Sequence, residues 1–288
     1  MRKKIVTVLL AVVCAFSFCA CAKGNTGNAP VSGGLNDVVL WGMPGTEKVY
    51  KDIARDSDYY KNYKTDAKID LLMAKGEYEG GQIIISANKD AKFDATASAL
   101  TNGANTIAAE NVEIFAQKYI TVSTNHDRAS NLPTAKYPDA LVPMANLKAA
   151  GENIVKKDEN QGLYVRVKTA TNQAAGVYTG NITVKIGDDS KEIPVRVEVA
   201  DVAVSEVVHN KSVFLNAWYF FEGELDTTQE MLDKYNEALL EYRLGMGTSL
   251  TWGRHHNEDL STEEKMAAWI KKAYDYMQDH ACPTIKMP

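Results

Sequence analysis

Cysteine is scarce in this chain: Cys14, Cys19 and Cys21 all lie at the N-terminus, and Cys282 is the only other one. The first three belong to a leader segment discussed below, so an exported protein would have no cysteine pair left for an internal disulfide. We therefore expect packed apolar cores to hold the fold together. Cys282 is expected to be a small buried apolar residue, not a nucleophile.

Positive charge is also in short supply. The chain carries 32 Lys and Arg against 37 Asp and Glu, for a formal net charge of -5, and it has no long basic block. This charge gives no support to nucleic-acid binding, and we expect no nucleic-acid partner. With 45% hydrophobic and 24% charged residues, the 288-residue chain has an ordinary globular composition that suits one or two domains.

Several patterns that carry chemistry are missing from the sequence. It contains no spaced His or Cys cluster for zinc, no Gly-rich phosphate loop and no Gly-x-Ser-x-Gly nucleophile elbow. The adjacent His255 and His256 do not share one face of a helix or strand, so chelation of a single metal is not expected. We predict neither a metal nor a cofactor.

No apolar run is long enough for a comfortable membrane span, which takes about 20 residues. The run from Ile5 to Ala20 follows Arg2-Lys3-Lys4, which is the order found in a secretory signal. The segment Phe18-Cys19-Ala20-Cys21 resembles a bacterial lipoprotein lipobox, with Phe18 where Leu is usual. We expect cleavage before Cys21 and diacylation of that residue; the alternative is a plain signal peptide cut nearby.

These features predict an exported lipoprotein that is anchored to the membrane at the bacterial cell surface. Two acyl chains on one residue hold a protein far more firmly than one. Residues 1–20 are assigned to the signal peptide. Residues 21–35, rich in Gly, Asn, Ser and Pro, are assigned to a flexible tether.

Residues 36–208 carry the pattern of an antiparallel β-sandwich domain. Short runs rich in Val, Ile, Thr and Tyr alternate with polar residues and end at Gly, Asn or Asp. Gly187-Asp188-Asp189 lies between two of these runs and predicts a hairpin turn. Many strands without helical periods between them favour a sandwich. The expected strands cover 68–73, 82–85, 112–115, 163–167, 177–186 and 193–199.

Residues 209–288 change to a strand–helix–strand–helix–strand order, which is typical of parallel α/β architecture. Strands are expected near 213–216, 245–251 and 283–287. Capping boxes start the two helices, Thr227 with Glu230 and Ser261 with Glu264. The predicted apolar faces carry Met231, Leu232, Tyr235, Ala238, Leu239 and Tyr242 on the first helix, and Met266, Trp269, Ile270, Ala273 and Met277 on the second.

These units are too few to close a (β/α)8 TIM barrel, which needs about 250 residues. Buried parallel strands with open edges are prone to aggregate. We therefore expect residues 209–288 to be the truncated start of a barrel in an N-terminal fragment, the alternative being an untypical packing. The predicted fold class is a β-sandwich N-terminal domain followed by the first β/α units of an incomplete (β/α)8 TIM barrel.

Three segments in order along the chain resemble the N-terminal part of glycoside hydrolase family 123. They are Lys-Gly-Glu-Tyr-Glu-Gly-Gly-Gln at 75–82, Tyr-Pro-Asp-Ala-Leu-Val-Pro at 137–143 and Ala-Gly-Val-Tyr-Thr-Gly at 175–180, and the run 193–199 then closes the sandwich. The resemblance implies an exported β-N-acetylgalactosaminidase with a β-sandwich before a (β/α)8 barrel. It also implies an adjacent Asp-Glu pair in the barrel. There the Glu acts as general acid, and the Asp orients the substrate's acetamido group to attack the anomeric carbon.

That catalytic pair is not expected within this chain. The only Asp-Glu dipeptide is Asp158-Glu159 in the sandwich half, where a solvated loop of mixed charge is expected. Protonating a glycosidic oxygen requires a carboxylic acid with a raised pKa. We therefore assign no catalytic residue, and the sequence leaves open whether this chain alone is an enzyme.

We expect the residues after Asn210 to contribute to substrate binding. Barrel enzymes place their sites on loops at the C-terminal ends of strands, and aromatic faces suit sugar rings. Core packing is the alternative for the two tryptophans. Met43-Pro44 and the tyrosine-rich 59–63 segment are further candidates for glycan contact, with a plain linker as the alternative. The predicted substrate-binding residues are Trp218, Tyr219, Trp252, Arg254 and His255.

Two classes of function follow from these features. The first is the N-terminal portion of a surface-anchored glycosidase resembling family 123, whose partner is a glycan containing N-acetylhexosamine. The second is a non-catalytic surface lipoprotein that binds glycan or protein through the β-sandwich. A solute-binding lipoprotein of a transporter fits the signal but not the sandwich-first order.

Overall fold

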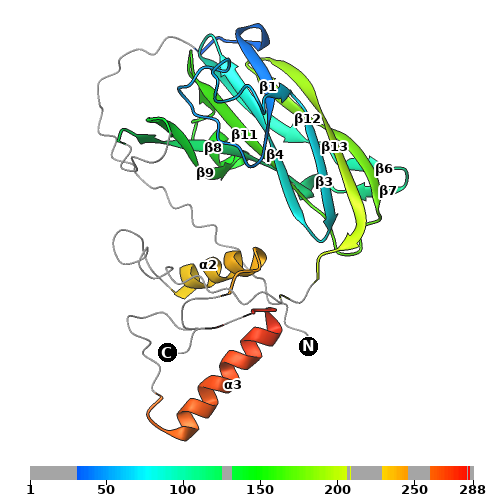
Figure 1. Cartoon of the computed structure of the whole chain (residues 1–288), viewed down its shortest axis with the longest axis vertical. Helices are drawn as coiled ribbons and strands as arrows, with labels where there is room; N and C mark the ends of the chain where they lie inside the picture. Colours follow the sequence, from blue (N-terminus) through cyan, green and yellow to red (C-terminus); the bar gives the residue numbers. More distant parts are fainter. Residues whose placement is uncertain are drawn as a thin grey trace, which may run out of the picture.

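The computed structural model describes residues 31–124, 132–205, 208, 229–245, 260–283 and 285. A two-sheet β-sandwich occupies the first two ranges, and two longer helices follow (Figure 1). The α-helices are α1 (Met144–Ala149), α2 (Gln229–Glu241) and α3 (Glu263–Asp279), and short 3-10 helices lie before β1 at Leu35–Asp37 and before β8 at Ala109–Asn111. The strands are β1 (Val38–Pro44), β2 (Thr65–Asp66), β3 (Ile69–Lys75), β4 (Tyr78–Ala87), β5 (Ala91–Ala97), β6 (Leu100–Asn102), β7 (Asn105–Ile107), β8 (Val112–Val122), β9 (Ala135–Pro143), β10 (Ile154–Val155), β11 (Asn160–Lys168), β12 (Gly176–Ile186) and β13 (Asp189–Ala203).

The two sheets confirm the predicted sandwich, with one correction to its pairing. The six-stranded sheet has the order β2-β1-β4-β11-β8-β9, and the seven-stranded sheet has the order β10-β5-β12-β13-β3 with the β6–β7 hairpin on β12. The pairings are antiparallel except that β3 runs parallel to β13, with Ile69 opposite Val195. No tight turn joins these two strands, so no hairpin geometry forces them to be antiparallel.

The main core lies between the sheets and is built by alternation along the strands. In β3, Ile69, Leu71 and Met73 are buried while Asp70 and Leu72 are exposed. Leu72 is an apolar residue left on the outside, with 68% of its surface accessible. The inward residues of β4, β11, β12 and β13 complete this core. The predicted strands therefore lie where the period-two pattern indicated.

The predicted hairpin at 187–189 is confirmed between β12 and β13. Ile186 pairs with Asp189, so Gly187 and Asp188 form the turn. Gly187 has φ of +60°, a conformation that glycine adopts without steric cost. A Cβ at this position would also lie 2.8 Å from the carbonyl oxygen of Gly33.

A second apolar cluster covers the outer face of the six-stranded sheet. Residues 45–64 fold back over this face, and β4 is consequently buried on both sides, with Ile83, Ile84 and Ile85 fully inaccessible. Met43 and Tyr60 belong to this cluster and are 4% and 1% exposed, so the suggestion that they contact glycan is wrong. The cluster consists of Trp41, Met43, Val49, Tyr50, Tyr60, Ile84 and Ala135.

The second half contains both predicted helices, but the start of α3 differs from the prediction. Thr262, not Ser261, is the N-cap, and its hydroxyl accepts a hydrogen bond of 3.2 Å from the backbone N–H of Lys265. On the predicted apolar face, Trp269 and Ala273 are buried, whereas Met266 and Ile270 are 41% and 49% exposed.

Helix α2 also buries a different side chain from those predicted. Asn236 is buried, whereas Tyr235 and Ala238 are exposed. Thr227 of the predicted capping box lies outside the described residues, as do the first predicted strand and most of the second and third. The β/α units of a barrel therefore stay a prediction, and so does the boundary between 208 and 209. Within the described ranges, no helix is long and apolar enough to cross a membrane.

Candidate functional site

The sequence predicts five residues that bind substrate and one that carries lipid. Cys21, Trp218, Tyr219, Trp252, Arg254 and His255 lie outside the described residues. In the part of the chain that the structure describes, no group of three or more His, Cys, Asp and Glu residues is arranged to hold a metal ion. Cys282 is buried, as predicted. Three features of the sandwich remain as candidates: the Asp-Glu dipeptide, a cleft at its edge and the motifs that carried the family resemblance.

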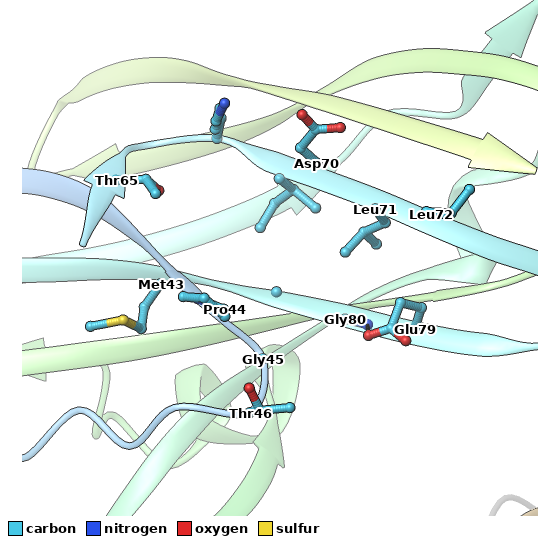
Figure 2. Close-up of a pocket in the computed structure, with 13 residues that line it drawn as sticks. Met43, Pro44, Gly45, Thr46, Thr65, Asp70, Leu71, Leu72, Glu79 and Gly80 are labelled. Carbon is cyan, nitrogen blue, oxygen red and sulfur yellow. Dashed lines mark hydrogen bonds between the residues drawn. The ribbon is translucent and has the colours of Figure 1, made fainter. Parts of the chain in front are cut away.

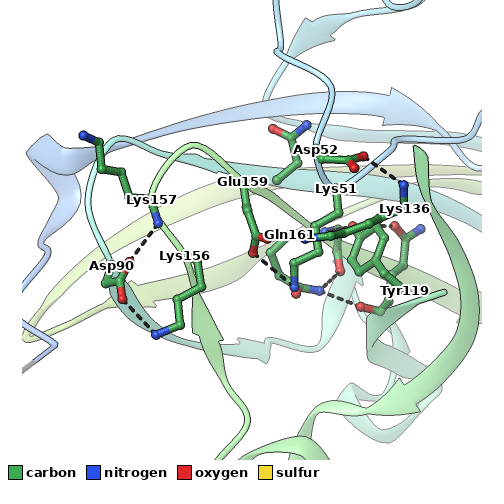
Figure 3. Close-up of polar contacts among 12 residues, drawn as sticks. Lys51, Asp52, Asp90, Tyr119, Lys136, Lys156, Lys157, Glu159 and Gln161 are labelled. Carbon is green, nitrogen blue, oxygen red and sulfur yellow. Dashed lines mark hydrogen bonds and ion pairs between the residues drawn. The ribbon is translucent and has the colours of Figure 1, made fainter. Parts of the chain in front are cut away.

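The Asp-Glu dipeptide divides into one solvated and one enclosed side chain. Asp158 has φ of +61° in a tight turn, and 77% of its side chain is exposed. Glu159 has only 17% of its side chain exposed, and its carboxylate lies 2.9 Å from Lys136 Nζ and 3.4 Å from Lys51 Nζ (Figure 3). The expected solvated loop is therefore wrong for Glu159. The reason is that residues 45–64 fold over the sheet and bring Lys51 to it.

A chain of hydrogen bonds next to Glu159 fixes the same covering segment. The Asn160 amide is 3% exposed and donates to the carbonyls of Tyr50 at 2.9 Å and Ile53 at 2.7 Å. Its oxygen accepts from Ser86 Oγ at 2.5 Å, and Ser86 accepts from Trp41 Nε1 at 2.8 Å. The network thus links β1, β4 and β11 to residues 50–53.

The electrostatics of this region indicate a structural role for Glu159. The hydrogen bond from Lys136 to Glu159, and the attraction between their charges, raise the pKa of Lys136 above its ordinary value. Each carboxylate oxygen of Glu159 is occupied by one lysine ammonium. A general acid must instead present a proton to its substrate. The geometry therefore describes a clamp that holds residues 45–64 on the sheet.

A cleft of about 370 Å³ opens at the edge of the sandwich, where β3 of one sheet faces β1 and β4 of the other (Figure 2). Its lining combines buried Ile69 and Leu71 with the exposed polar side chains of Asp70 and Glu79. Leu71 points toward β4 while Asp70 points away from it (Figure 2). Sequence reasoning missed this cleft, because its walls come from strands in different sheets. The only local signal was the alternation along β3.

The glycines of the 75–82 motif shape one wall of this cleft. A Cβ at Gly80 would lie 2.7 Å from the ring of Tyr164, and one at Gly81 would lie 3.2 Å from Ile69 Cδ1. Gly76 forms the turn before β4 with φ of +74°. Glycine is therefore needed where β4 passes between its neighbours at close range.

The polar residues of the same motif fasten the turns around β4. The Glu77 carboxylate accepts a hydrogen bond of 2.5 Å from the Ala74 N–H, which closes the turn between β3 and β4. The buried Gln82 amide donates to the carbonyls of Pro44 at 2.6 Å and Glu47 at 2.7 Å. The polar residues of the motif are therefore explained by hydrogen bonds within the fold, without a ligand.

The other two motifs are also explained by packing. Tyr137 donates to the Pro133 carbonyl at 2.6 Å, and its ring packs edge-on against Tyr50 at 4.7 Å between centroids. Tyr178 is fully buried and donates to the Ala174 carbonyl at 2.7 Å. A Cβ at Gly180 would lie 2.7 Å from the Ala99 carbonyl oxygen. All three motifs therefore mark positions that this particular sandwich requires.

The comparisons with known proteins agree with these motifs. Residues 54–186 match the family model of the glycoside hydrolase 123 N-terminal domain. A solved family 123 glycoside hydrolase from Clostridium perfringens, described for glycolipid glycan hydrolysis, is 16% identical with a TM-score of 0.54. At that identity the likeness concerns the fold. The predicted resemblance is confirmed: residues 54–186 match the N-terminal domain of glycoside hydrolase family 123.

The extent of these matches is partial. The Clostridium perfringens match covers 73% of this chain and 37% of that enzyme, so this chain spans well under half of its length. The CooA pilin subunit of enterotoxigenic Escherichia coli is 14% identical over 59% of this chain and 99% of that one, with a TM-score of 0.25. A non-cellulosomal cohesin from Archaeoglobus fulgidus is 10% identical over 46% and 88%, with a TM-score of 0.23. With such low TM-scores, neither of these two structures indicates the fold or the function of this chain. No curated protein matches it significantly.

Proposed function

We propose that this chain is the N-terminal portion of a cell-surface glycoside hydrolase of family 123 that acts on glycans containing N-acetylgalactosamine. The observation that carries the proposal is the family match over residues 54–186, which lies within the sandwich. The Clostridium perfringens enzyme, whose description names glycolipid glycan hydrolysis, supports a glycan as substrate. Trp218, Tyr219, Trp252, Arg254 and His255 are proposed to contact the sugar.

The proposed mechanism is substrate-assisted. The acetamido oxygen of the substrate attacks the anomeric carbon and expels the leaving-group oxygen, which takes a proton from a Glu. A neighbouring Asp orients the acetamido group. We place this Asp-Glu pair beyond the present chain, because Glu159 of the only Asp-Glu dipeptide is bound to Lys51 and Lys136. The sandwich would then serve as the scaffold on which the catalytic half is built.

The first experiment is to sequence the DNA directly downstream of the Pro288 codon and to express both the extended product and this chain. We expect the extended frame to encode further strand–helix units with an Asp-Glu pair. Its product should release N-acetylgalactosamine from a glycolipid glycan, whereas this chain should release none. A stop codon directly after Pro288, with a folded and exported chain, would favour the binding-only lipoprotein. Release of N-acetylgalactosamine by this exact chain would contradict the placement of the catalytic pair.

Membrane anchoring is a separate part of the proposal and has its own test. In a bacterial host given radiolabelled palmitate, the wild-type chain should be labelled and recovered with the membrane fraction. Cys21→Ala should lose both properties. Cys19→Ala is the matched control, because it changes a cysteine of the leader and leaves the acceptor in place. Equal labelling of both variants would contradict lipidation at Cys21.

A further inference from the structure

One surface of the sandwich is not involved in the proposed function. It lies on the outer face of the six-stranded sheet, at the end of β4 and β11 opposite to the covering segment 45–64. Register pairs its residues across neighbouring strands: Lys168 of β11 lies opposite Tyr78 of β4, and Arg166 lies opposite Glu113 of β8. We call the following residues the Arg166 strip: Tyr78, Glu113, Phe115, Arg166 and Lys168.

Arg166 is held in one position by the strip. Its guanidinium carbon lies 4.8 Å from the ring centroid of Tyr78 and 5.1 Å from that of Phe115. Nε donates a hydrogen bond of 2.8 Å to Glu113 Oε2, and Nη2 forms an ion pair with the same oxygen at 2.7 Å. Only 16% of the Arg166 side chain is exposed. An arginine fixed between aromatic rings and a carboxylate is ready to bind a further group with little loss of side-chain entropy.

The last turn of α2 lies on this strip. Tyr78 donates its phenolic proton to Glu241 Oε1 at 2.5 Å. Arg166 Nη1 donates to the phenolic oxygen of Tyr242. The rings of Tyr78 and Tyr242 lie 6.3 Å apart, and the Arg166 guanidinium carbon lies 5.8 Å from the Tyr242 ring. Two consecutive residues of the helical half therefore contact two strands of the sandwich, β4 and β11, through aromatic and charged groups.

Helix α2 ends at Glu241, and Tyr242 is the residue that follows it. The Leu244 N–H donates to the Leu239 carbonyl and the Arg243 N–H to the Leu240 carbonyl, both at 2.9 Å, which is the Schellman pattern. Arg243 occupies the left-handed position of this motif with φ of +61°, where glycine is usual. A non-glycine residue is disfavoured there, because its Cβ lies too close to the following carbonyl oxygen. The helix thus stops in an unfavourable conformation at the point where it meets the strip.

We propose that the Arg166 strip is the docking surface through which the sandwich holds the helical half of the same chain, with Glu241 and Tyr242 as the docked residues. The hydrogen bonds of Tyr78 and Arg166 with Glu241 and Tyr242 identify the docked segment. The contact is polar and aromatic, so it fixes orientation through directed hydrogen bonds. The inference goes beyond the proposed function, because it stands on these contacts whether or not the complete protein is a glycosidase.

The test is hydrogen exchange of the full chain, read separately for α2 and for the β12–β13 hairpin. Tyr242→Ala removes contacts with Arg166 and Tyr78 and should raise exchange in the last turn of α2 about fivefold, which corresponds to a contact worth about 1 kcal/mol. Exchange in β12–β13 should not change. Glu237→Ala, an exposed residue of the same helix, is the matched control and should leave the last turn at the wild-type rate.

A double-mutant cycle distinguishes docking from local helix effects. Tyr78→Phe removes only the hydroxyl that donates to Glu241, and Glu241→Gln alters only the acceptor. If the two groups act together across the interface, the double variant should raise α2 exchange no more than the stronger single variant. The proposal would be overturned if the effects of Tyr78→Phe and Glu241→Gln on α2 exchange multiplied in the double variant. It would also be overturned if Tyr242→Ala raised exchange no more than Glu237→Ala does. Increased exchange of β12–β13 in Tyr242→Ala would overturn it as well, by showing a contact required for the sandwich itself.

Discussion

Gln117 lies so close to Gly162 on the neighbouring strand that a Cβ at position 162 would be 2.0 Å from its Oε1. The missing side chain lets the Gln117 amide cross β11 and donate to Gln82 Oε1 on β4 at 2.8 Å. Gln82 in turn donates to the carbonyls of Pro44 and Glu47. One glycine therefore permits a buried polar chain from β8 to the start of the covering segment.

Gly162→Ala is expected to lower the free energy of unfolding by about 1–3 kcal/mol, because the new methyl group displaces the Gln117 amide from Gln82. Urea denaturation of the full chain measures the change. In a Gln117→Ala background the methyl group meets no amide, so the same substitution should cost much less. An equal cost in both backgrounds would show that backbone strain, not Gln117, is responsible.

Glu159→Gln should destabilise the sandwich by about 1–3 kcal/mol, because it leaves Lys51 and Lys136 without their shared anionic partner. The pKa of Lys136 should fall toward its ordinary value, which NMR titration of its Nζ environment measures. Asp158→Asn is the matched control, since that side chain is 77% exposed, and it should change stability by about 0.5 kcal/mol or less. Equal effects of the two substitutions would contradict the clamp.

Stability should decline above about pH 10 through the tyrosines of the second cluster. Burial and the neighbouring Tyr137 raise the pKa of Tyr50 to about 12, and burial also raises the pKa of Tyr60. An unfolded chain releases these phenolic protons near pH 10, while the folded chain retains them. The stabilisation is thus complete below pH 10 and lost as the pH rises toward 12. Urea midpoints across this range measure the slope, which Tyr60→Phe should reduce; an unchanged slope would contradict the assignment.

Thr262→Ala should weaken the start of α3, with a cost of about 1 kcal/mol to the helix. The lost group is the hydroxyl that accepts from the Lys265 N–H. Hydrogen exchange of the first turn of α3 measures the effect, and Thr262→Ser should retain most of the protection. A larger effect from Ser261→Ala would instead favour the cap that the sequence predicted.

The strands and turns of the sandwich could be predicted because their signals are local. Alternation along 69–73 placed Ile69 and Leu71 inside, and Gly187-Asp188 marked the β12–β13 turn. The parallel pairing of β3 with β13 could not be predicted, since no connecting turn determines it. Tyr60 looked like part of an exposed aromatic segment, because sequence alone does not show that residues 45–64 fold over the sheet.

The candidate site also has some features that could be predicted from the sequence and others that only the structure shows. The motifs at 75–82, 137–143 and 175–180 indicated the resemblance that the family match over residues 54–186 confirms. In this sandwich their glycine, glutamine and tyrosine residues lie where the packing is close. The hydrogen bonds through which these side chains hold the turns could be recognised only once the structure showed their partners. The predicted sugar-contacting residues lie outside the described residues, so the sequence-based assignment of Trp218 and Trp252 stays a prediction.

By itself the sequence determined the strands, the β12–β13 hairpin and two helices, because alternation, turn residues and helical spacing act over a few neighbouring positions. Its motifs also indicated the resemblance to glycoside hydrolase family 123. Tertiary structure alone decided that Glu159 is enclosed by Lys136, 23 residues away, and that Arg166 contacts Tyr242, 76 residues away. Tyr78 and Glu241 meet across 163 residues. Such partners are chosen by how the sheets and helices pack, and residues so far apart in sequence show no local pattern that records it.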